Sequence, residues 1–123
     1  MTEQELNEKL VRWVCPKARI SRGEFGSEFI PSGKPFRTHQ IDAKPVPHYT
    51  RSLDDCFRDL IPRVDIEATR DLDIQFTHRE DKPDNVWQVV ISSGGINMGV
   101  GEGSPSLGLC VAINNFLSNL VKL

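Results

Sequence analysis

Basic and aromatic side chains alternate through residues 17–51, where regular secondary structure is hardest to find. Aromatic rings and guanidinium planes stack on a base, and arginine or lysine side chains neutralise phosphates. This combination is typical of a site for a nucleotide-like anion. The alternative is a loop whose aromatic residues pack into the core while its cations stay in water. The residues concerned are Arg22, Phe25, Lys34, Phe36, Arg37, Tyr49 and Arg51.

A glycine-rich stretch, residues 92–103, leads into a predicted helix start at Ser104 and Pro105. Serine is a good N-cap, and proline at the first helical position gives up an N–H that has no intrahelical partner. The open end of a helix is a place where anions bind. The match to phosphate-binding loops is weak, because no Walker lysine follows and the third glycine stands one place early for a dinucleotide fingerprint. A tight turn is the commoner meaning of such glycines, and Glu102 would repel an anion unless it turns away.

The sequence holds no arrangement typical of a catalytic or metal site. Its three histidines lie apart, without metal-ligand spacing, and no GxSxG, HExxH or Cys–His nucleophile pattern occurs. Paired acids at 54–55 and 71–73 fit a helix first turn and a strand start. We therefore expect no enzymatic activity, no cofactor and no metal. His48 is a ligand candidate because it directly precedes Tyr49 in front of a predicted helix cap.

Length and composition predict a single domain, residues 1–123. The net charge of −2 argues against general nucleic-acid binding. No apolar stretch approaches the roughly 18 residues that a membrane span needs, and the first residues do not resemble a secretory signal. Three widely separated cysteines suit a reducing compartment better than a disulfide scaffold. These features predict a cytoplasmic protein without a membrane partner.

Charge is unevenly distributed along the chain. Residues 17–51 contain seven basic and three acidic residues, whereas residues 52–85 contain five basic and ten acidic ones. A basic segment beside an acidic one is either a site for a small anion or a pair of solvated faces that attract each other.

Two capping patterns predict the first two helices. Thr2-Glu-Gln-Glu5 is a capping box followed by apolar residues at helical spacing, which predicts a helix over residues 3–14. Ser52-Leu-Asp-Asp55 is similar and predicts a helix over residues 53–61. A proline follows each predicted helix closely, and prolines normally end helices.

The connection between these helices, residues 17–51, contains four prolines and three glycines. We expect it to be irregular, interrupted at most by short strands near residues 19–21 and 28–30. Its aromatic residues argue against disorder, since disordered segments are poor in them.

Alternation of apolar and polar residues predicts strands over residues 72–77 and 87–92. The polar turn between them favours an antiparallel hairpin. A further short strand is expected near residues 96–100.

The C-terminal helix is predicted over residues 105–121, with an apolar stripe that includes Phe116 and Leu117. The order of elements predicts an α+β fold, in which an antiparallel β-sheet is packed with an N-terminal, a central and a C-terminal helix in a sandwich-like arrangement.

Three segments of the chain resemble the phage ABA sandwich domain family of small phage and prophage proteins. Leu6-Asn-Glu-Lys-Leu-Val-Arg-Trp13 is similar to its opening amphipathic helix, and Pro47-His-Tyr-Thr-Arg-Ser-Leu-Asp-Asp55 to the segment that leads into its second helix. Ser104-Pro-Ser-Leu-Gly-Leu-Cys-Val-Ala-Ile113 resembles its closing helix. The chain departs from the family at Phe57, where many members have tryptophan, and residues 18–46 match no part of the pattern.

Most members of that family have no assigned activity. Similar compact phage proteins, the Thoeris anti-defence sponges, bind cyclic ADP-ribose-type immune signals and hold them without cleaving them. The resemblance therefore implies a phage-encoded, non-catalytic binder in the cytoplasm of an infected bacterium. Its ligand would be a small anionic nucleotide signal, either cyclic ADP-ribose-like or a cyclic oligonucleotide. The alternative is a protein-interaction module or accessory phage protein that docks on a host protein and binds no small molecule.

The predicted partners are this nucleotide-like anion and further copies of the chain, as a dimer or higher homo-oligomer. Self-association is expected because the core is lean and the sheet has edges that a partner can pair. The predicted ligand-binding residues are Arg22, Phe25, Lys34, Phe36, Arg37, His48, Tyr49, Arg51 and Ser104.

Overall fold

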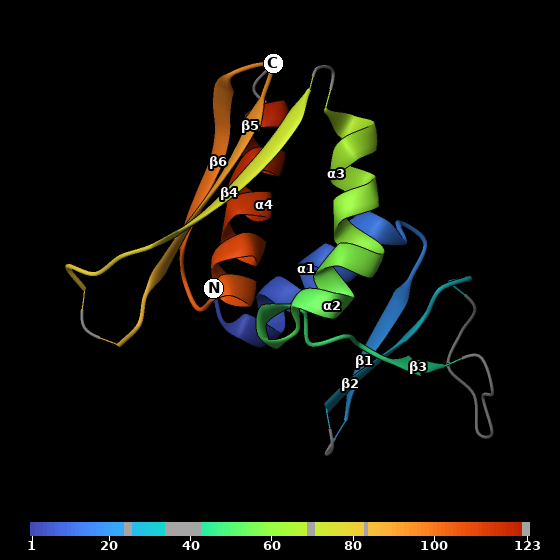
Figure 1. The fold of residues 1–123 in the computed structure, drawn as a ribbon. Coiled ribbons are helices and arrows are strands. Elements are labelled where there is room, and N and C mark those ends of the chain that lie inside the picture. The colour runs from blue at the N-terminus through green and yellow to red at the C-terminus, as the bar shows by residue number, and fades with distance from the viewer. Residues whose placement is uncertain (24–25, 34–42, 69–70, 83, 122–123) are drawn as a thin grey trace. The chain divides into compact units, whose positions relative to one another are not determined.

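The structure is a computed structural model with an α+β fold, as the sequence predicts (Figure 1). The chain divides into two compact units, Met1–His48 and Tyr49–Leu123, which are described separately below. The residues that the structure describes are 1–23, 26–33, 43–68, 71–82 and 84–121.

The first unit opens with helix α1, Glu3–Val14, at the bounds predicted from the sequence. The side chain of Thr2 accepts a hydrogen bond from the Glu5 N–H at 3.1 Å, which confirms the N-cap. The apolar stripe of α1 is buried through Leu6, Leu10 and Val11.

A three-stranded antiparallel sheet follows, in the order β1-β2-β3. Its strands are β1, Arg19–Gly23, β2, Gly26–Ile30, and the two-residue β3, Lys44–Pro45. The two short strands predicted in this region therefore exist. Only the end of β2 is buried.

The second unit begins with a helical segment that is longer than predicted. It consists of the 3₁₀ turn η1, Tyr49–Arg51, helix α2, Leu53–Asp55, the π-helical turn η2, Cys56–Leu60, and helix α3, Ile61–Glu67.

The predicted end of this helix before Pro62 is wrong. The N–H of Ile61 bonds to the carbonyl of Cys56, five residues back, so the chain is wider here than in an α-helix. This widening accommodates the proline ring, which clashes with a carbonyl in a regular helix. Pro62 then occupies the first turn of α3, where its missing N–H costs little.

The second sheet has the order β4-β5-β6 and is antiparallel throughout. The predicted hairpin is confirmed by β4, Leu72–His78, and β5, Trp87–Ser93, which pair without interruption. The last strand, β6, Ile96–Gly103, extends beyond the predicted 96–100 and includes most of the glycine-rich stretch. The chain thus forms two sheets where the sequence suggested one.

Helix α4, Pro105–Val121, lies along the second sheet (Figure 1). A Cβ at Gly101 would collide with the carbonyl oxygen of Gly108, and a Cβ at Gly99 with that of Ala112. The glycines of β6 therefore allow the strand and the helix backbone to touch. This close packing is a structural reason for glycine that does not involve a phosphate.

The core of the second unit is built on α4. Leu109, Ile113 and Phe116 have no exposed surface, and Val89 and Ile91 of β5 are equally buried. Leu117, predicted to share the buried stripe, is only half-buried.

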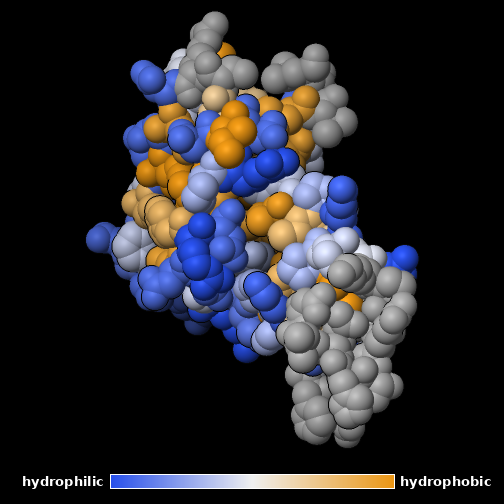
Figure 2. Space-filling model, turned by 90° about the vertical axis from the view of Figure 1, so that its right-hand side faces the viewer, coloured by the Kyte–Doolittle hydropathy of each residue, from blue (hydrophilic) through white to orange (hydrophobic). Residues whose placement is uncertain are grey.

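Large hydrophobic residues on the surface are scattered among hydrophilic ones, as Figure 2 shows for one face. Within the described ranges, no helix combines the length and the apolar character that crossing a membrane requires.

Candidate functional site

The predicted ligand-binding residues are distributed over both units. Arg22 and His48 lie in the first unit, and Tyr49, Arg51 and Ser104 lie in the second. The remaining four lie outside the described residues: Phe25, Lys34, Phe36 and Arg37.

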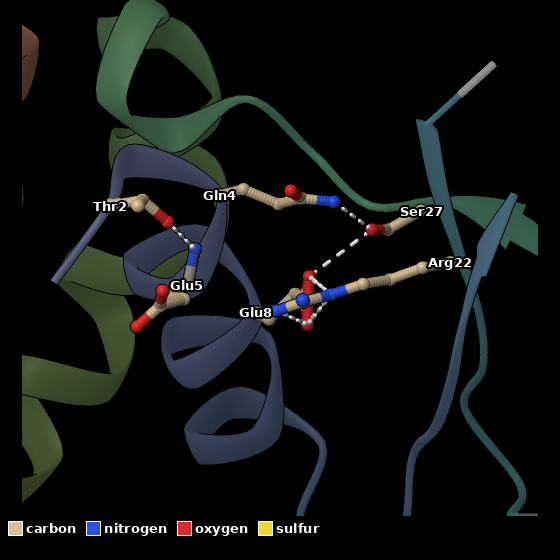
Figure 3. Close-up of polar contacts among 6 residues, drawn as sticks. All are labelled: Thr2, Gln4, Glu5, Glu8, Arg22 and Ser27. Carbon is tan, nitrogen blue, oxygen red and sulfur yellow. Dashed lines mark hydrogen bonds and ion pairs between the residues drawn. The ribbon is translucent and has the colours of Figure 1, made fainter. Parts of the chain in front are cut away.

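Arg22 is held by a carboxylate of α1 (Figure 3). Its Nε lies 3.0 Å from Oε2 of Glu8, and its Nη2 donates to Oε1 at 3.2 Å. Ser27 Oγ donates to the same carboxylate at 3.2 Å and accepts from Gln4 Nε2 at 2.9 Å. The hydrogen bond and the charge of Glu8 raise the pKa of Arg22.

This network attaches the β1–β2 hairpin to α1. The Glu8 side chain is 4% exposed and that of Arg22 56%, so the carboxylate is buried beneath a solvated guanidinium. A buried carboxylate requires such partners, because its desolvation is costly. Arg22 thus has a structural function in the first unit, and its charge is balanced locally.

His48 is exposed in the first unit. Among the residues that the structure describes, it makes no hydrogen bond or ring contact with the other predicted ligand residues.

Tyr49 is a core residue of the second unit. Only 2% of its surface is exposed, and its hydroxyl donates to Oδ2 of Asp59 at 2.9 Å. Asp59 also accepts from Nε of Arg58 at 2.8 Å. The hydrogen bond from Arg58 has the largest effect and lowers the pKa of Asp59. Burial acts in the opposite direction, and the hydrogen bond from Tyr49 lowers the pKa further. In this conformation the tyrosine ring offers no face on which a base can stack.

Arg51 and Ser104 come together through their neighbours. Ser106 Oγ, in the first turn of α4, donates to the carbonyl oxygen of Thr50 at 2.9 Å, and this bond is buried. It joins η1 to the start of α4. We call residues 49–52 and 104–106 the helix-start cluster.

Both helices that meet at this cluster begin with a serine cap. Ser104 Oγ accepts from the N–H of Leu107 at 3.3 Å, and Ser52 Oγ accepts from the N–H of Asp55 at 3.2 Å. Helix starts carry a partial positive charge from their unpaired N–H groups. Arg51 is exposed and stands directly before the Ser52 cap, next to Thr50, whose carbonyl oxygen accepts the hydrogen bond from Ser106 of α4.

The electrostatics of the two helix starts differ. The first turn of α2 contains Asp54 and Asp55, which compensate its dipole. The first turn of α4 contains no acidic residue. Glu102 does not compensate the dipole of α4. It alternates on β6 with the glycines that face α4, so it lies on the opposite face of the strand, and its carboxylate lies 3.6 Å from Nη1 of Arg79.

The start of α4 therefore favours an anion. The described part of the chain contains no group of histidine, cysteine and acidic side chains that could hold a metal ion.

The sequence did not single out Ser106, Thr50 or Glu8. Ser106 follows the helix cap, and its partner stands 56 positions earlier, so no local pattern reveals the bond. Glu8 stands three residues before the buried Val11 on the same side of α1, which gives a weak indication that it is buried.

Comparisons of the chain with protein-family models, with curated protein sequences and with solved structures found no match. The resemblance to the phage ABA sandwich family therefore stays a prediction.

Proposed function

We propose that the protein is a non-catalytic binder that sequesters a small nucleotide-like anion, with a phosphate held at the helix-start cluster. The resemblance to phage proteins suggests its biological role, which is to remove a cyclic ADP-ribose-like or cyclic oligonucleotide immune signal in an infected bacterium.

The Ser106–Thr50 hydrogen bond carries this proposal. It brings an exposed arginine, two helix starts and Ser104 to one place in the second unit, although these residues are far apart in the sequence. N–H groups at helix starts and arginine side chains are donors that phosphate-binding sites use. The uncompensated dipole of α4 adds to the attraction.

Binding without cleavage fits the hydroxyl groups of the cluster. Ser104 Oγ accepts a hydrogen bond as a helix cap, and Ser106 Oγ donates to a backbone carbonyl. A serine nucleophile instead requires a neighbouring base that takes its proton. We therefore assign these serines to structure and to phosphate contact.

The proposal is tested by recovering the ligand. Purified protein is mixed with a panel of ADP-ribose, cyclic ADP-ribose isomers and cyclic dinucleotides, separated from the unbound compounds and heated. Mass spectrometry then identifies what is released. Release of one compound unchanged is expected from the parent protein, and release of a cleaved product would show an enzyme.

Two charge reversals make the test specific. Arg51→Glu removes the cation at the cluster, whereas Lys9→Glu makes the same change at an exposed position of α1. Recovery is expected to fall for Arg51→Glu alone. If the parent retains no compound from the panel, or if both variants retain as much as the parent, the proposed site is wrong.

A further inference from the structure

The two edge strands of the β4-β5-β6 sheet, β6 and β4, differ in whether other parts of the chain bond to their backbone groups. On the β6 side, Asn115 Nδ2 of α4 donates to the carbonyl oxygen of Val100 at 2.7 Å, and Asn119 Nδ2 donates to that of Met98. Side chains of the helix thus satisfy backbone groups of this strand. On the other side β4 ends the sheet, and within the described ranges no backbone hydrogen bond extends its ladder outward.

β4 has few of the features that usually protect an edge strand. It runs for seven residues, Leu72–His78, in continuous register with β5, and it contains no proline or lysine and a single acidic residue, Asp73. Natural proteins blunt exposed edges with such residues, with bulges or with short strands. A long regular edge without them is a template for another strand.

The hydrophobic residues on this face of the sheet are less buried on β4 than on the central strand β5. Ile74 and Phe76 lie opposite Ile91 and Val89 on the same face. The two β5 residues are fully buried, whereas their β4 partners are half-buried. A strand added beside β4 would place further side chains next to Ile74 and Phe76 and bury more of their surface.

We propose that two copies of the chain pair through β4, antiparallel and with a two-fold axis at Gln75, into a continuous six-stranded sheet. In this register Ile74 lies opposite the partner's Phe76, and Leu72 lies opposite the partner's His78. The only acidic residue of the strand, Asp73, lies opposite the partner's Thr77 and not opposite another carboxylate. The strand is therefore complementary to itself, as an isologous interface requires.

This register makes residue 77 a test position, because Thr77 is exposed and its substitution leaves the monomer core intact. Thr77→Lys creates two symmetry-related pairs with Asp73 across the interface, and Thr77→Asp creates two repulsive ones. Each cross-strand charge pair is worth about 0.2–1 kcal/mol. The dissociation constant of the dimer should therefore fall by about twofold to thirtyfold with lysine and rise by a similar factor with aspartate.

Sedimentation equilibrium over a range of concentrations measures these constants. Gln88→Lys and Gln88→Asp are matched controls, because Gln88 pairs with Thr77 inside the monomer but lies on the central strand. They should leave dimerisation unchanged. A parent protein that remains monomeric at all concentrations, or a dimer that responds equally at positions 77 and 88, would overturn the proposal.

Cross-linking tests the two-fold axis directly. In a Cys15→Ser background, Gln75→Cys should form a disulfide-linked dimer with oxidised glutathione. Residues opposite each other have Cβ atoms about 4.5–5.5 Å apart, and a small movement of the strands brings them to the roughly 3.5–4.5 Å that a disulfide spans. Gln88→Cys should not, since three strand spacings of about 4.8 Å separate the two copies of β5. Absence of the Gln75→Cys cross-link in a protein that dimerises would exclude this register. Dimerisation at β4 does not depend on the proposed ligand.

Discussion

At the residue scale, Tyr49 shows how one side chain supports two opposite interpretations. Its place in a row of basic and aromatic residues suggests an exposed ring for a base. In the structure the ring is buried, and its hydroxyl donates a hydrogen bond to Asp59, ten residues later. The sequence does not reveal this pairing, because it depends on how η1, α2 and η2 follow one another.

The Tyr49–Asp59 hydrogen bond predicts a pH-dependent loss of stability on Tyr49→Phe. A hydrogen bond to a charged group contributes about 1.5–3 kcal/mol, so the variant should unfold more easily by that amount at pH 7. The folded-state pKa of Asp59 lies below its ordinary value. The ionised Asp59 carboxylate therefore contributes fully to the free energy of unfolding above its ordinary pKa, near 4. This contribution is lost as the pH falls through the folded-state pKa.

Urea denaturation of parent and variant at pH 7 and at about pH 3 checks this prediction. The difference in the free energy of unfolding between parent and variant should be smaller at the lower pH. In an Asp59→Asn background, Tyr49→Phe should show little dependence on pH. An equal cost at both pH values in the parent background would mean that the charge of Asp59 has no part in the interaction.

At the element scale, periodicity predicted the elements that follow one regular pattern. The caps and apolar stripes of α1 and α4 and the alternation of β4 and β5 were sufficient to place them. The central helix was predicted too short, because a π-helical turn that admits Pro62 has no recognised pattern in the sequence.

The glycines of β6 were the hardest element to interpret. A glycine-rich stretch before a helix fits both a phosphate loop and a strand pressed against a helix, and the sequence does not distinguish these cases. The distinction lies in the backbone contact with α4. The same limit applies to the site, where Arg51 and Ser104 were predicted singly but their connection through Ser106 was not.

Close packing of β6 on α4 predicts that Gly101→Ala destabilises the second unit. The added methyl group would collide with the Gly108 carbonyl, so strand and helix must separate. Overpacking of this kind costs about 1–3 kcal/mol.

Gly108→Ala is the matched control for this change. Its Cβ would lie 3.0 Å from Cγ2 of Val89, a side-chain contact that a shift of a few tenths of an ångström relieves, and alanine gains about 1 kcal/mol of helix propensity. Thermal denaturation should therefore show a clear loss for Gly101→Ala and a change within about 1 kcal/mol for Gly108→Ala. Equal melting temperatures for Gly101→Ala and the parent would show that the backbones are not in close contact.

At the scale of the whole molecule, the second unit contains both proposed interaction surfaces. The helix-start cluster lies where η1 meets α4, and the open edge lies on β4. The two proposals are independent, since a dimer through β4 needs no ligand and a phosphate at the cluster needs no second copy. The first unit presents an attached hairpin in which Arg22 is already paired with Glu8. The predicted single domain stays a prediction.

The binding of a nucleotide-like anion at the helix-start cluster is tested most directly by calorimetric titration with the compound released from the heated protein. Removing a charge-assisted contact costs about 1.5–3 kcal/mol, so Arg51→Glu should weaken binding tenfold or more. Glutamate before a helix cap suits the helix dipole, so the variant should keep its fold. Lys9→Glu should bind like the parent. Equal affinity of parent, Arg51→Glu and Lys9→Glu would contradict the account.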